Sequence, residues 1–308
     1  MTRGDWAMTT SVVPLLDLHD APARFREQLL AGASWGAAEL AGAEQCRELA
    51  RRTELAASEF FAGDESEKAA SVSPSGHRNR GWTSAADDDG QPVYDRLSIA
   101  RFDDAAAASA GGVPAEYTGL YEHPNVWPSP ELKALTERFR DSVVRTCEQL
   151  LARISEALGV KPDDLFAGAP DNTNITLTEY HPRAGLPAGD GNPLSFPEHK
   201  DRSLLSLLSE SGEPGRLQIE SLTGEWLTCR PDPARFVVLF GLTAEKRTGG
   251  LLRAGNHRVL PPRTGRRRST SNFYFPHLAT PTGSLFGEVA AERETVGQVL
   301  LAARGRSL

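Results

Sequence analysis

The residues most able to do chemistry begin with His199 and Asp201, which are separated by one lysine. In a β-strand, residues two apart point to the same face, so this H-x-D step aims an imidazole and a carboxylate at one point. Two imidazoles and one carboxylate on one face of an octahedral metal ion leave three coordination positions open for reaction. An H-x-D step is expected by chance in a chain with 7 histidines, so the pair needs a distant third ligand.

His257 is the candidate for that third ligand, because it directly precedes an apolar strand signal. The alternative is a structural histidine at the end of a strand. Arg267 and Ser269 follow, again two residues apart, and a guanidinium with a neighbouring hydroxyl can grip a carboxylate through several hydrogen bonds. The other arginines of the run RTGRRR are interpreted as a solvated turn.

These residues lie in a β-rich second half. After Asp171 the chain alternates and breaks into short strand-like runs between Gly, Pro and Asp residues, which is typical of a barrel or jelly roll. The first part reads as helical, with helices expected near 24–30, capped by Asp20, and near 43–61. Residues 70–95 are expected to form an irregular loop and 105–115 a flexible connection.

The strongest element is a helix that starts at Ser129-Pro130 and ends at Gly159, with apolar residues at three- and four-residue steps. We expect this helix to brace one sheet of the β body. The chain is therefore predicted to be a single domain over 1–308. A mostly helical part would cover 1–170, a jelly-roll core with the metal site 171–280, and a helical tail 281–308.

Composition restricts the class of protein. Hydrophobic residues make up 39% and charged residues 24% of the 308 residues, and the net charge is −7. An acidic chain argues against nucleic acid as the main partner. No apolar run is long enough to span a membrane, and the start lacks a secretory signal. Three widely spaced cysteines indicate no disulfide framework, so a cytoplasmic protein is expected, most simply a monomer.

The ordered motifs resemble the isopenicillin N synthase-like family of iron(II)/2-oxoglutarate-dependent oxygenases, which includes ACC oxidase and deacetoxycephalosporin C synthase. The similar segments are PLLDL, FFAGDESEK, NVWPSP, EHKDRSLLSLL, GRLQIESLTGEWLTCRPDPARFVV, NHRV and RRSTSNFYFP. The resemblance implies a mainly β double-stranded β-helix with N-terminal helices. It also implies that His199, Asp201 and His257 hold Fe(II), and that Arg267 and Ser269 bind 2-oxoglutarate. Pro276 sets the register that favours Arg267 over Arg268.

Two positions depart from the family pattern. Leu242 stands where the family usually has an aspartate before the distal histidine. The residue just before Pro182 is usually a tyrosine near the cosubstrate, and here it is His181, with Tyr180 one place earlier.

The resemblance implies oxidation of a small metabolite, by hydroxylation, desaturation or cyclisation, with O2 consumed and 2-oxoglutarate decarboxylated. One alternative is an oxidase that uses iron and O2 without 2-oxoglutarate. The other is a non-catalytic binding protein on the same fold, against which an intact set of ligands argues. The substrate itself is not predictable from the sequence.

One strand before the metal motif suggests pocket residues. In ITLTEYHP, alternation places Ile175, Leu177, Glu179 and His181 on one face. The family register puts the residue before the proline inside the barrel, so Leu177, Glu179 and His181 are expected to line the pocket. A buried carboxylate must be paired. Glu179 would therefore either form a structural salt bridge with an arginine, face water after a register slip, or receive an amine of the substrate.

Overall fold

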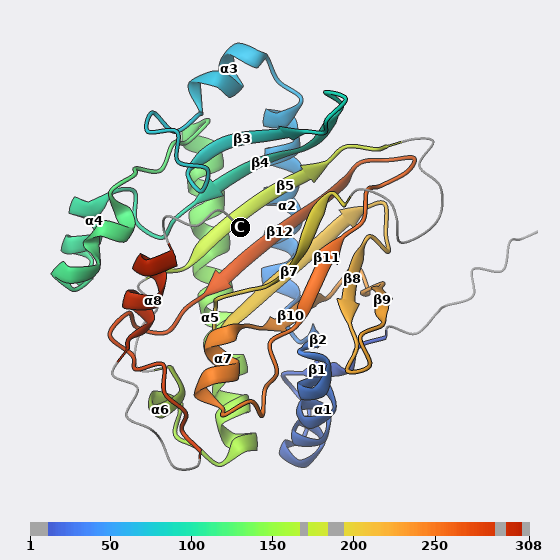
Figure 1. Ribbon diagram of the computed structural model, residues 1–308, viewed down its shortest axis with the longest axis vertical. Helices are drawn as coiled ribbons and strands as arrows, with labels where there is room; N and C mark the ends of the chain where they lie inside the picture. Colours follow the sequence, from blue (N-terminus) through green and yellow to red (C-terminus); the bar gives the residue numbers. More distant parts are fainter. Residues whose placement is uncertain (1–11, 167–171, 184–193, 287–293, 304–308) are drawn as a thin grey trace, which may run out of the picture.

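The computed structural model describes residues 12–166, 172–183, 194–286 and 294–303. The described strands form two sheets, and the larger has eight strands in the order β1-β2-β10-β7-β12-β5-β4-β3 (Figure 1). Its strands are β1 (Leu15–Asp17), β2 (Ala37–Ala41), β3 (Gly81–Ala86), β4 (Pro92–Ile99), β5 (Asn174–Tyr180), β7 (Leu205–Gly212), β10 (Phe236–Phe240) and β12 (Arg267–Tyr274). All neighbours are antiparallel except β1 and β2.

The smaller sheet has the order β6-β11-β8-β9. Its strands are β6 (Phe196–Lys200), β8 (Leu217–Glu220), β9 (Trp226–Cys229) and β11 (Asn256–Val259). Apolar side chains fill one end of the space between the sheets, among them Leu208 from the large sheet and Leu217 and Ile219 from the small one. Two facing, mainly antiparallel sheets around a shared interior confirm the predicted jelly roll.

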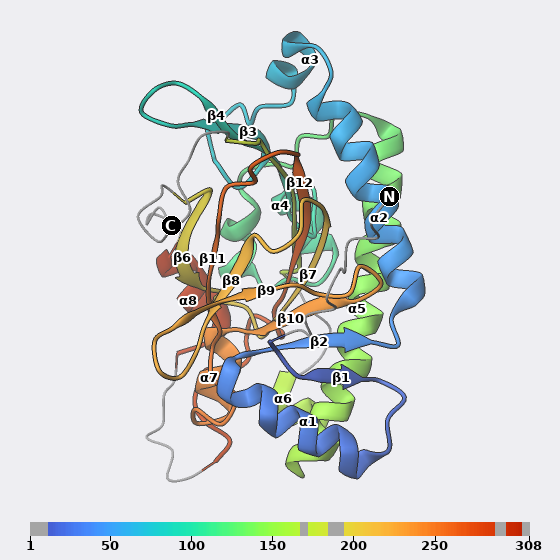
Figure 2. The same ribbon diagram turned by 90° about the vertical axis from the view of Figure 1, so that its right-hand side faces the viewer.

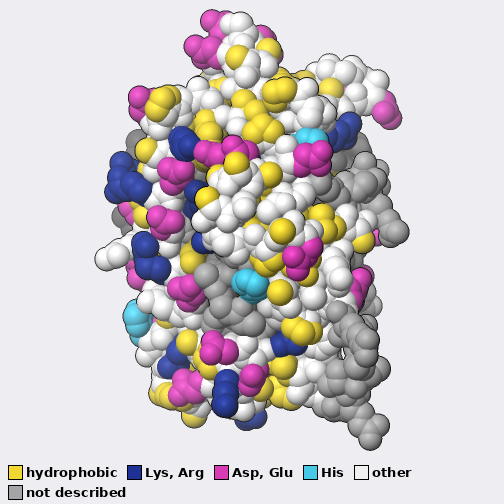
Figure 3. Space-filling view, turned by 90° about the vertical axis from the view of Figure 1, so that its left-hand side faces the viewer, with side chains coloured by type: hydrophobic (Ala, Val, Ile, Leu, Met, Phe, Trp, Pro, Cys, Tyr) yellow, Lys and Arg dark blue, Asp and Glu magenta, His cyan; other side chains and the backbone are white. Residues whose placement is uncertain are grey.

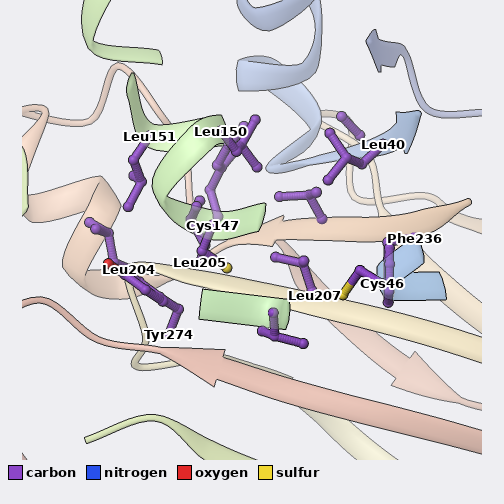
Figure 4. Close-up of a cluster of buried hydrophobic side chains, with 14 of the residues drawn as sticks. Leu40, Cys46, Cys147, Leu150, Leu151, Leu204, Leu205, Leu207, Phe236 and Tyr274 are labelled. Atoms are coloured by element: carbon purple, nitrogen blue, oxygen red, sulfur yellow. The ribbon is translucent and has the colours of Figure 1, made fainter. Parts of the chain in front are cut away.

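Three helices cover the outer face of the large sheet: α1 (Pro22–Trp35), α2 (Glu44–Phe61) and α5 (Pro130–Leu158). Figure 2 shows α2 and α5 next to each other on the right of the large sheet, with β6, β8 and β11 on its left. The close-up in Figure 4 shows Cys147 and Leu151 on the side of α5 that faces Leu204, Leu205 and Tyr274, and all five belong to one buried cluster. The long helix therefore braces the sheet as predicted.

Local sequence explains where α5 begins and ends. The Ser129 side chain accepts a hydrogen bond from the backbone N–H of Leu132, Pro130 occupies the first turn, and Gly159 ends the helix in the left-handed conformation. A serine cap of this kind contributes about 1 kcal/mol. Capping at α1 differs from the prediction, because its N-cap is Ala21 and the Asp20 carboxylate instead pairs with Arg24.

The remaining helices are short. They are α3 (Glu65–Ala70), α4 (Ala105–Ala110), the 3-10 helix η1 (Ala115–Tyr121), α6 (Pro162–Phe166), α7 (Leu242–Arg247) and α8 (Val296–Ala303). Within the described residues, no helix is long and apolar enough to cross a membrane.

Two predictions about the first half were wrong. The segment expected to be an irregular loop contains β3 and β4, which extend the large sheet beyond β5. The expected flexible connection contains α4, whose first turn is capped by Asp104. The boundary drawn at residue 170 therefore does not separate helices from sheet, since β1 to β4 all belong to the large sheet.

Candidate active site

His199, Asp201 and His257 come together at one edge of the small sheet. Strand β11 pairs with β6 so that His257 lies directly opposite His199, and their ring centroids are 4.2 Å apart. Asp201 follows β6 directly. One potential ligand atom from each residue lies within 4.8 Å of the others. The local alternation of β6 and the cross-strand register of β11 thus build the predicted group.

Hydrogen bonds fix the tautomer of both imidazoles. His199 Nδ1 donates to the carbonyl oxygen of Pro197 at 2.9 Å, and His257 Nδ1 donates to that of Gly255 at 3.1 Å. Since a carbonyl can only accept, each Nδ1 carries the hydrogen and each Nε2 keeps its lone pair. This orientation by a second group is typical of metal-ligating histidines.

The position of Gly255 depends on a close backbone approach. A Cβ on Gly255 would come within 2.5 Å of the carbonyl oxygen of Gly36. Glycine at this position therefore lets the beginning of β11, which carries His257, lie against the end of α1.

Asp201 is a buried carboxylate that lacks part of its hydrogen bonding. Its residue is 6% exposed, Oδ1 lies 3.5 Å from His199 Nε2, and Oδ2 is buried without a hydrogen-bond partner. Buried polar atoms are nearly always paired, so an orphaned carboxylate oxygen needs an explanation. A metal cation held between the three side chains supplies one.

The electrostatics of the three groups favour ligating forms. Burial alone would raise the pKa of Asp201, but His257 and His199 outweigh it and hold that pKa below its usual value. Burial lowers the pKa of His257, although the nearby Asp201 charge opposes that shift. An ionised carboxylate beside a neutral imidazole is the state that binds a divalent metal.

Arg267 lies in the same interior, at the start of β12. Its residue is 2% exposed, and its Nε and Nη2 donate to Glu210 Oε2 at 3.0 and 2.7 Å. Nη1 is buried without a partner. The guanidinium carbon stands 5.1 Å from the ring centre of Tyr180, directly across the strand pair. Arg267 is therefore held in place with one donor group free.

A cavity of about 1100 Å³ between the sheets contains all of these groups. The predicted residues on its wall are His199, Asp201, His257, Arg267 and Ser269. Arg268 points the other way, where its Nε donates to Ser58 and Glu179. The orientation of the two arginines agrees with the choice of Arg267 over Arg268.

The predicted face of β5 was wrong. Leu177 packs in the core beneath α2 and α5, and Glu179 hydrogen-bonds Ser58 of α2 and pairs with Arg266 and Arg268. His181 bonds Asp95 at 2.8 Å and does not line the cavity. None of these three is a pocket residue, and the structural salt bridge is the arrangement found for Glu179.

The opposite face of β5 lines the cavity, with Thr176, Thr178 and Tyr180. Strand β5 ends at Tyr180, so His181 lies beyond it and is a poor anchor for strand alternation. Tyr180 was therefore missed as a site residue. Pairing β5 with β12 would have found it, because Tyr180 stands opposite Arg267.

The residues present fit Fe(II) and 2-oxoglutarate. Two imidazoles and one carboxylate with an orphaned oxygen match the facial donor set of iron oxygenases. The free Nη1 of Arg267 and the Ser269 hydroxyl match one end of a dicarboxylate. Jelly roll, ligand set and clamp together define a class, the iron-dependent oxygenases that use a keto-acid cosubstrate.

Comparison with known proteins points to one family. Residues 172–276 match the family described as the 2OG-Fe(II) oxygenase superfamily. It is 28% identical to 2'-deoxymugineic-acid 2'-dioxygenase of Hordeum vulgare over 268 residues, which are 86% of this chain and 74% of that protein. It is also 28% identical to jasmonate-induced oxygenase 4 of Arabidopsis thaliana over 176 residues, 56% of this chain.

Solved structures share the fold. That of a dioxygenase for auxin oxidation from Arabidopsis thaliana, in a complex with 2-oxoglutarate, matches with a TM-score of 0.69 and 17% identity, covering 92% of this chain and 99% of that one. The description of the matching family names the predicted metal and cosubstrate, Fe(II) and 2-oxoglutarate. The match to jasmonate-induced oxygenase 4 spans about half the length of that relative, 49%.

Proposed function

We propose that this protein is an Fe(II)- and 2-oxoglutarate-dependent oxygenase that oxidises a small organic molecule. The observation that carries the proposal is the pair of unsatisfied buried groups in one cavity, Asp201 Oδ2 and Arg267 Nη1. Asp201 Oδ2 calls for a cation, and Arg267 Nη1, on a guanidinium already paired with Glu210, calls for a further hydrogen-bond acceptor such as a carboxylate. Fe(II) with a bound dicarboxylate satisfies both.

The residues have separate tasks. His199, Asp201 and His257 would hold the iron through two Nε2 atoms and a carboxylate oxygen. Arg267, fixed by Glu210, would bind the far carboxylate of 2-oxoglutarate, with Ser269 and Tyr180 beside it. When bound, iron and cosubstrate supply the oxidising power, through oxidative decarboxylation of 2-oxoglutarate by O2. The chain orients both and shields the reaction from bulk water.

A small-molecule substrate is supported by the size of the cavity and by the relative from Hordeum vulgare, which is named as a dioxygenase of 2'-deoxymugineic acid. The acidic net charge supports the proposal that neither nucleic acid nor a membrane is a partner. Cys46, Cys147 and Cys229 are all free and buried, which fits a reducing cytoplasm. A monomer and a single domain stay predictions.

The test is anaerobic addition of Fe(II) and then 2-oxoglutarate, followed by the metal-to-ligand absorption band of the ternary complex. We expect the band in the wild-type protein and none in His257→Ala. Admission of O2 should then release succinate. An oxidase without a keto-acid requirement would bind iron but show no such band, and a non-catalytic protein would show no succinate.

A further inference from the structure

The cavity wall is cationic in a protein that is acidic overall. Among the described residues that line it, Asp201 is the one carboxylate, whereas the net charge of the chain is −7. The outer face seen in Figure 3 differs, since acidic and basic side chains alternate there. The lining cations are Arg78, Arg80, Arg96, Lys200, Arg202 and Arg267.

Several of these cations have evident partners. Arg80 donates to three backbone carbonyls, Lys200 lies 3.7 Å from Glu245, and Arg267 pairs with Glu210. Arg78 is exposed, so water solvates its charge. Arg202 directly follows the ligand Asp201 and is half-buried.

Arg96 is half-buried and differs from these cations in being stacked between two aromatic rings while its Nε has no partner. It lies on β4 opposite Thr178, with its guanidinium carbon 4.5 Å from the ring centre of Tyr94 and 4.7 Å from that of Phe196. Its Nε is buried without a hydrogen-bond partner, and within the described part of the chain no carboxylate pairs with it. Two aromatic rings thus hold a flat cation at a fixed place on the cavity wall.

That arrangement lacks a counter-charge. Stacking on rings compensates part of the cost of withdrawing a guanidinium from water, but its in-plane donors still need acceptors. A planar carboxylate is the natural complement, since it accepts two parallel hydrogen bonds from a guanidinium.

Arg96 lies near the proposed metal ligand His199 and on a different strand from Arg267, the proposed cosubstrate clamp. Phe196, which stacks on Arg96, also packs against His199 with ring centroids 4.8 Å apart, so one aromatic ring separates the guanidinium from a metal ligand. Arg267 lies on β12, two strands from β4 with β5 between them. The site can hold two acidic groups at once, one at each arginine.

We propose that Arg96 binds a carboxylate of the primary substrate, which makes small organic acids the substrate class of this enzyme. The inference rests on the proposed function, because it assigns the second arginine of the same cavity. Tyr94 and Phe196 position the guanidinium, and Phe273, Leu208 and Leu217 offer apolar wall to the rest of the molecule.

The experiment uses matched acids and amides on the full chain loaded with Fe(II) and 2-oxoglutarate without O2. The probes are monocarboxylic acids from propanoate to decanoate, with benzoate and 3-phenylpropanoate, each beside its primary amide. Binding is read by thermal shift and by perturbation of the metal-to-ligand band. We expect acids to bind the wild type and their amides to bind roughly tenfold or more weakly, because a charge-assisted pair is lost.

Arg96→Gln should abolish the preference for acids, and Arg96→Lys should restore part of it. Arg101→Gln is the matched control, since Arg101 also stacks on a ring, 5.1 Å from the centre of Phe102, but does not line the cavity. It should keep the preference. Acids and amides binding alike to the wild type, or an unchanged preference in Arg96→Gln, would overturn the proposal, as would loss of the preference in Arg202→Gln alone.

The absorption band measured before any probe is added distinguishes a failure of the proposed function from a failure of the proposed substrate class. If it fails to form in the wild type, the proposed function is wrong. If it forms equally in wild type and Arg96→Gln while no acid preference exists, only the substrate class is wrong. A band lost in Arg96→Gln would make Arg96 a cosubstrate residue and overturn its assignment to the substrate.

Discussion

The two faces of the large sheet around β5 differ in how their buried carboxylates are hydrogen-bonded. On the face toward α2, Glu179 accepts from Ser58 and pairs with Arg266 and Arg268, so both its oxygens have partners. On the cavity face, Asp201, Arg267 and Arg96 each keep a buried polar atom without a partner. Both faces bury ionised groups, and they differ in their carboxylates: both oxygens of Glu179 have partners, whereas Asp201 keeps one oxygen without a partner.

On the face toward α2, both carboxylate oxygens of Glu54 also have hydrogen-bond partners. Its Oε1 and Oε2 accept from Ser209 and Ser211 of β7. Strand alternation therefore directs Glu179, Ser209 and Ser211 toward α2, where the oxygens of Glu54 and Glu179 have partners although Arg47 Nε and Nη1 do not. A satisfied network holds one arrangement of strands, whereas open positions cost free energy that a ligand can recover.

The largest expected effect comes from removing one of the proposed metal ligands on the cavity face. His199→Ala or His257→Ala leaves two protein ligands, which we expect to be too few to retain Fe(II). Turnover should fall below detection, while circular dichroism and the unfolding midpoint of the apo protein change little. Iron content after gel filtration is the direct measurement. Normal iron content with full succinate release in either variant would contradict the assignment of the three ligands.

The next effect concerns the clamp. Arg267→Ala removes a charge-assisted interaction of about 1.5–3 kcal/mol, so the dissociation constant for 2-oxoglutarate should rise roughly ten- to hundredfold. Titration of the absorption band measures it. Arg268→Ala is the matched control, because its guanidinium contacts Ser58 and Glu179 on the helix face. A larger effect from Arg268 would mean that the cosubstrate lies elsewhere.

On the helix face, Glu179→Gln should affect stability and leave ligand affinity unchanged. Burial would raise the pKa of Glu179, but bonds from Ser58, Arg266 and Arg268 outweigh it and leave that pKa lowered. A lowered folded-state pKa adds stability above the unfolded-state value and loses it as pH falls through the folded-state value. The variant should lose roughly 1–3 kcal/mol of unfolding free energy at neutral pH.

Urea unfolding of both proteins along an acid series checks this prediction. The difference between wild type and Glu179→Gln should shrink as the pH falls below the usual range of a glutamate. Weakened binding of the acid probes by the variant, with unchanged stability, would instead revive the substrate-binding role that the sequence suggested for Glu179.

These contrasts show what the sequence could and could not predict. The grouping of His199, Asp201 and His257 was predictable, because the first two need only local alternation and His257 lies at the start of a predicted strand. The residues of β5 that face the cavity were predicted wrongly. The alternation was counted from His181, which lies beyond the end of the strand at Tyr180. A count begun one residue too far reverses every side chain.

The strands β3 and β4 were hidden for a different reason. The segment is rich in Ser, Gly and Asp, which have low strand propensity, and β3 is a half-exposed edge strand. Pairing of β4 with β5 supplies what local propensity does not. Arg96 could not be recognised before that pairing was known, since its place on the cavity wall follows from standing opposite Thr178.

The smallest expected effect is at Glu213, which lies in the turn region beside the clamp but off the cavity wall. It accepts backbone hydrogen bonds from Arg263, Thr264 and Gly265. Although burial would raise it, these bonds and the charge of Arg216 lower the pKa of Glu213 from 4.5 to about 2. Its stabilisation should thus be complete above about pH 4.5 and fade between there and about pH 2.

Glu213→Gln should therefore cost about 1 kcal/mol of unfolding free energy at neutral pH, since a neutral amide oxygen still accepts some of the same hydrogen bonds. The cost should vanish near the lower end of the acid series. The dissociation constant for 2-oxoglutarate should stay within about twofold of wild type, because Arg267 is fixed by Glu210 and not by this turn. If affinity for 2-oxoglutarate instead falls as far as in Arg267→Ala, the turn sets the position of the clamp. The division between satisfied structural charges and open cavity charges would then fail at this point.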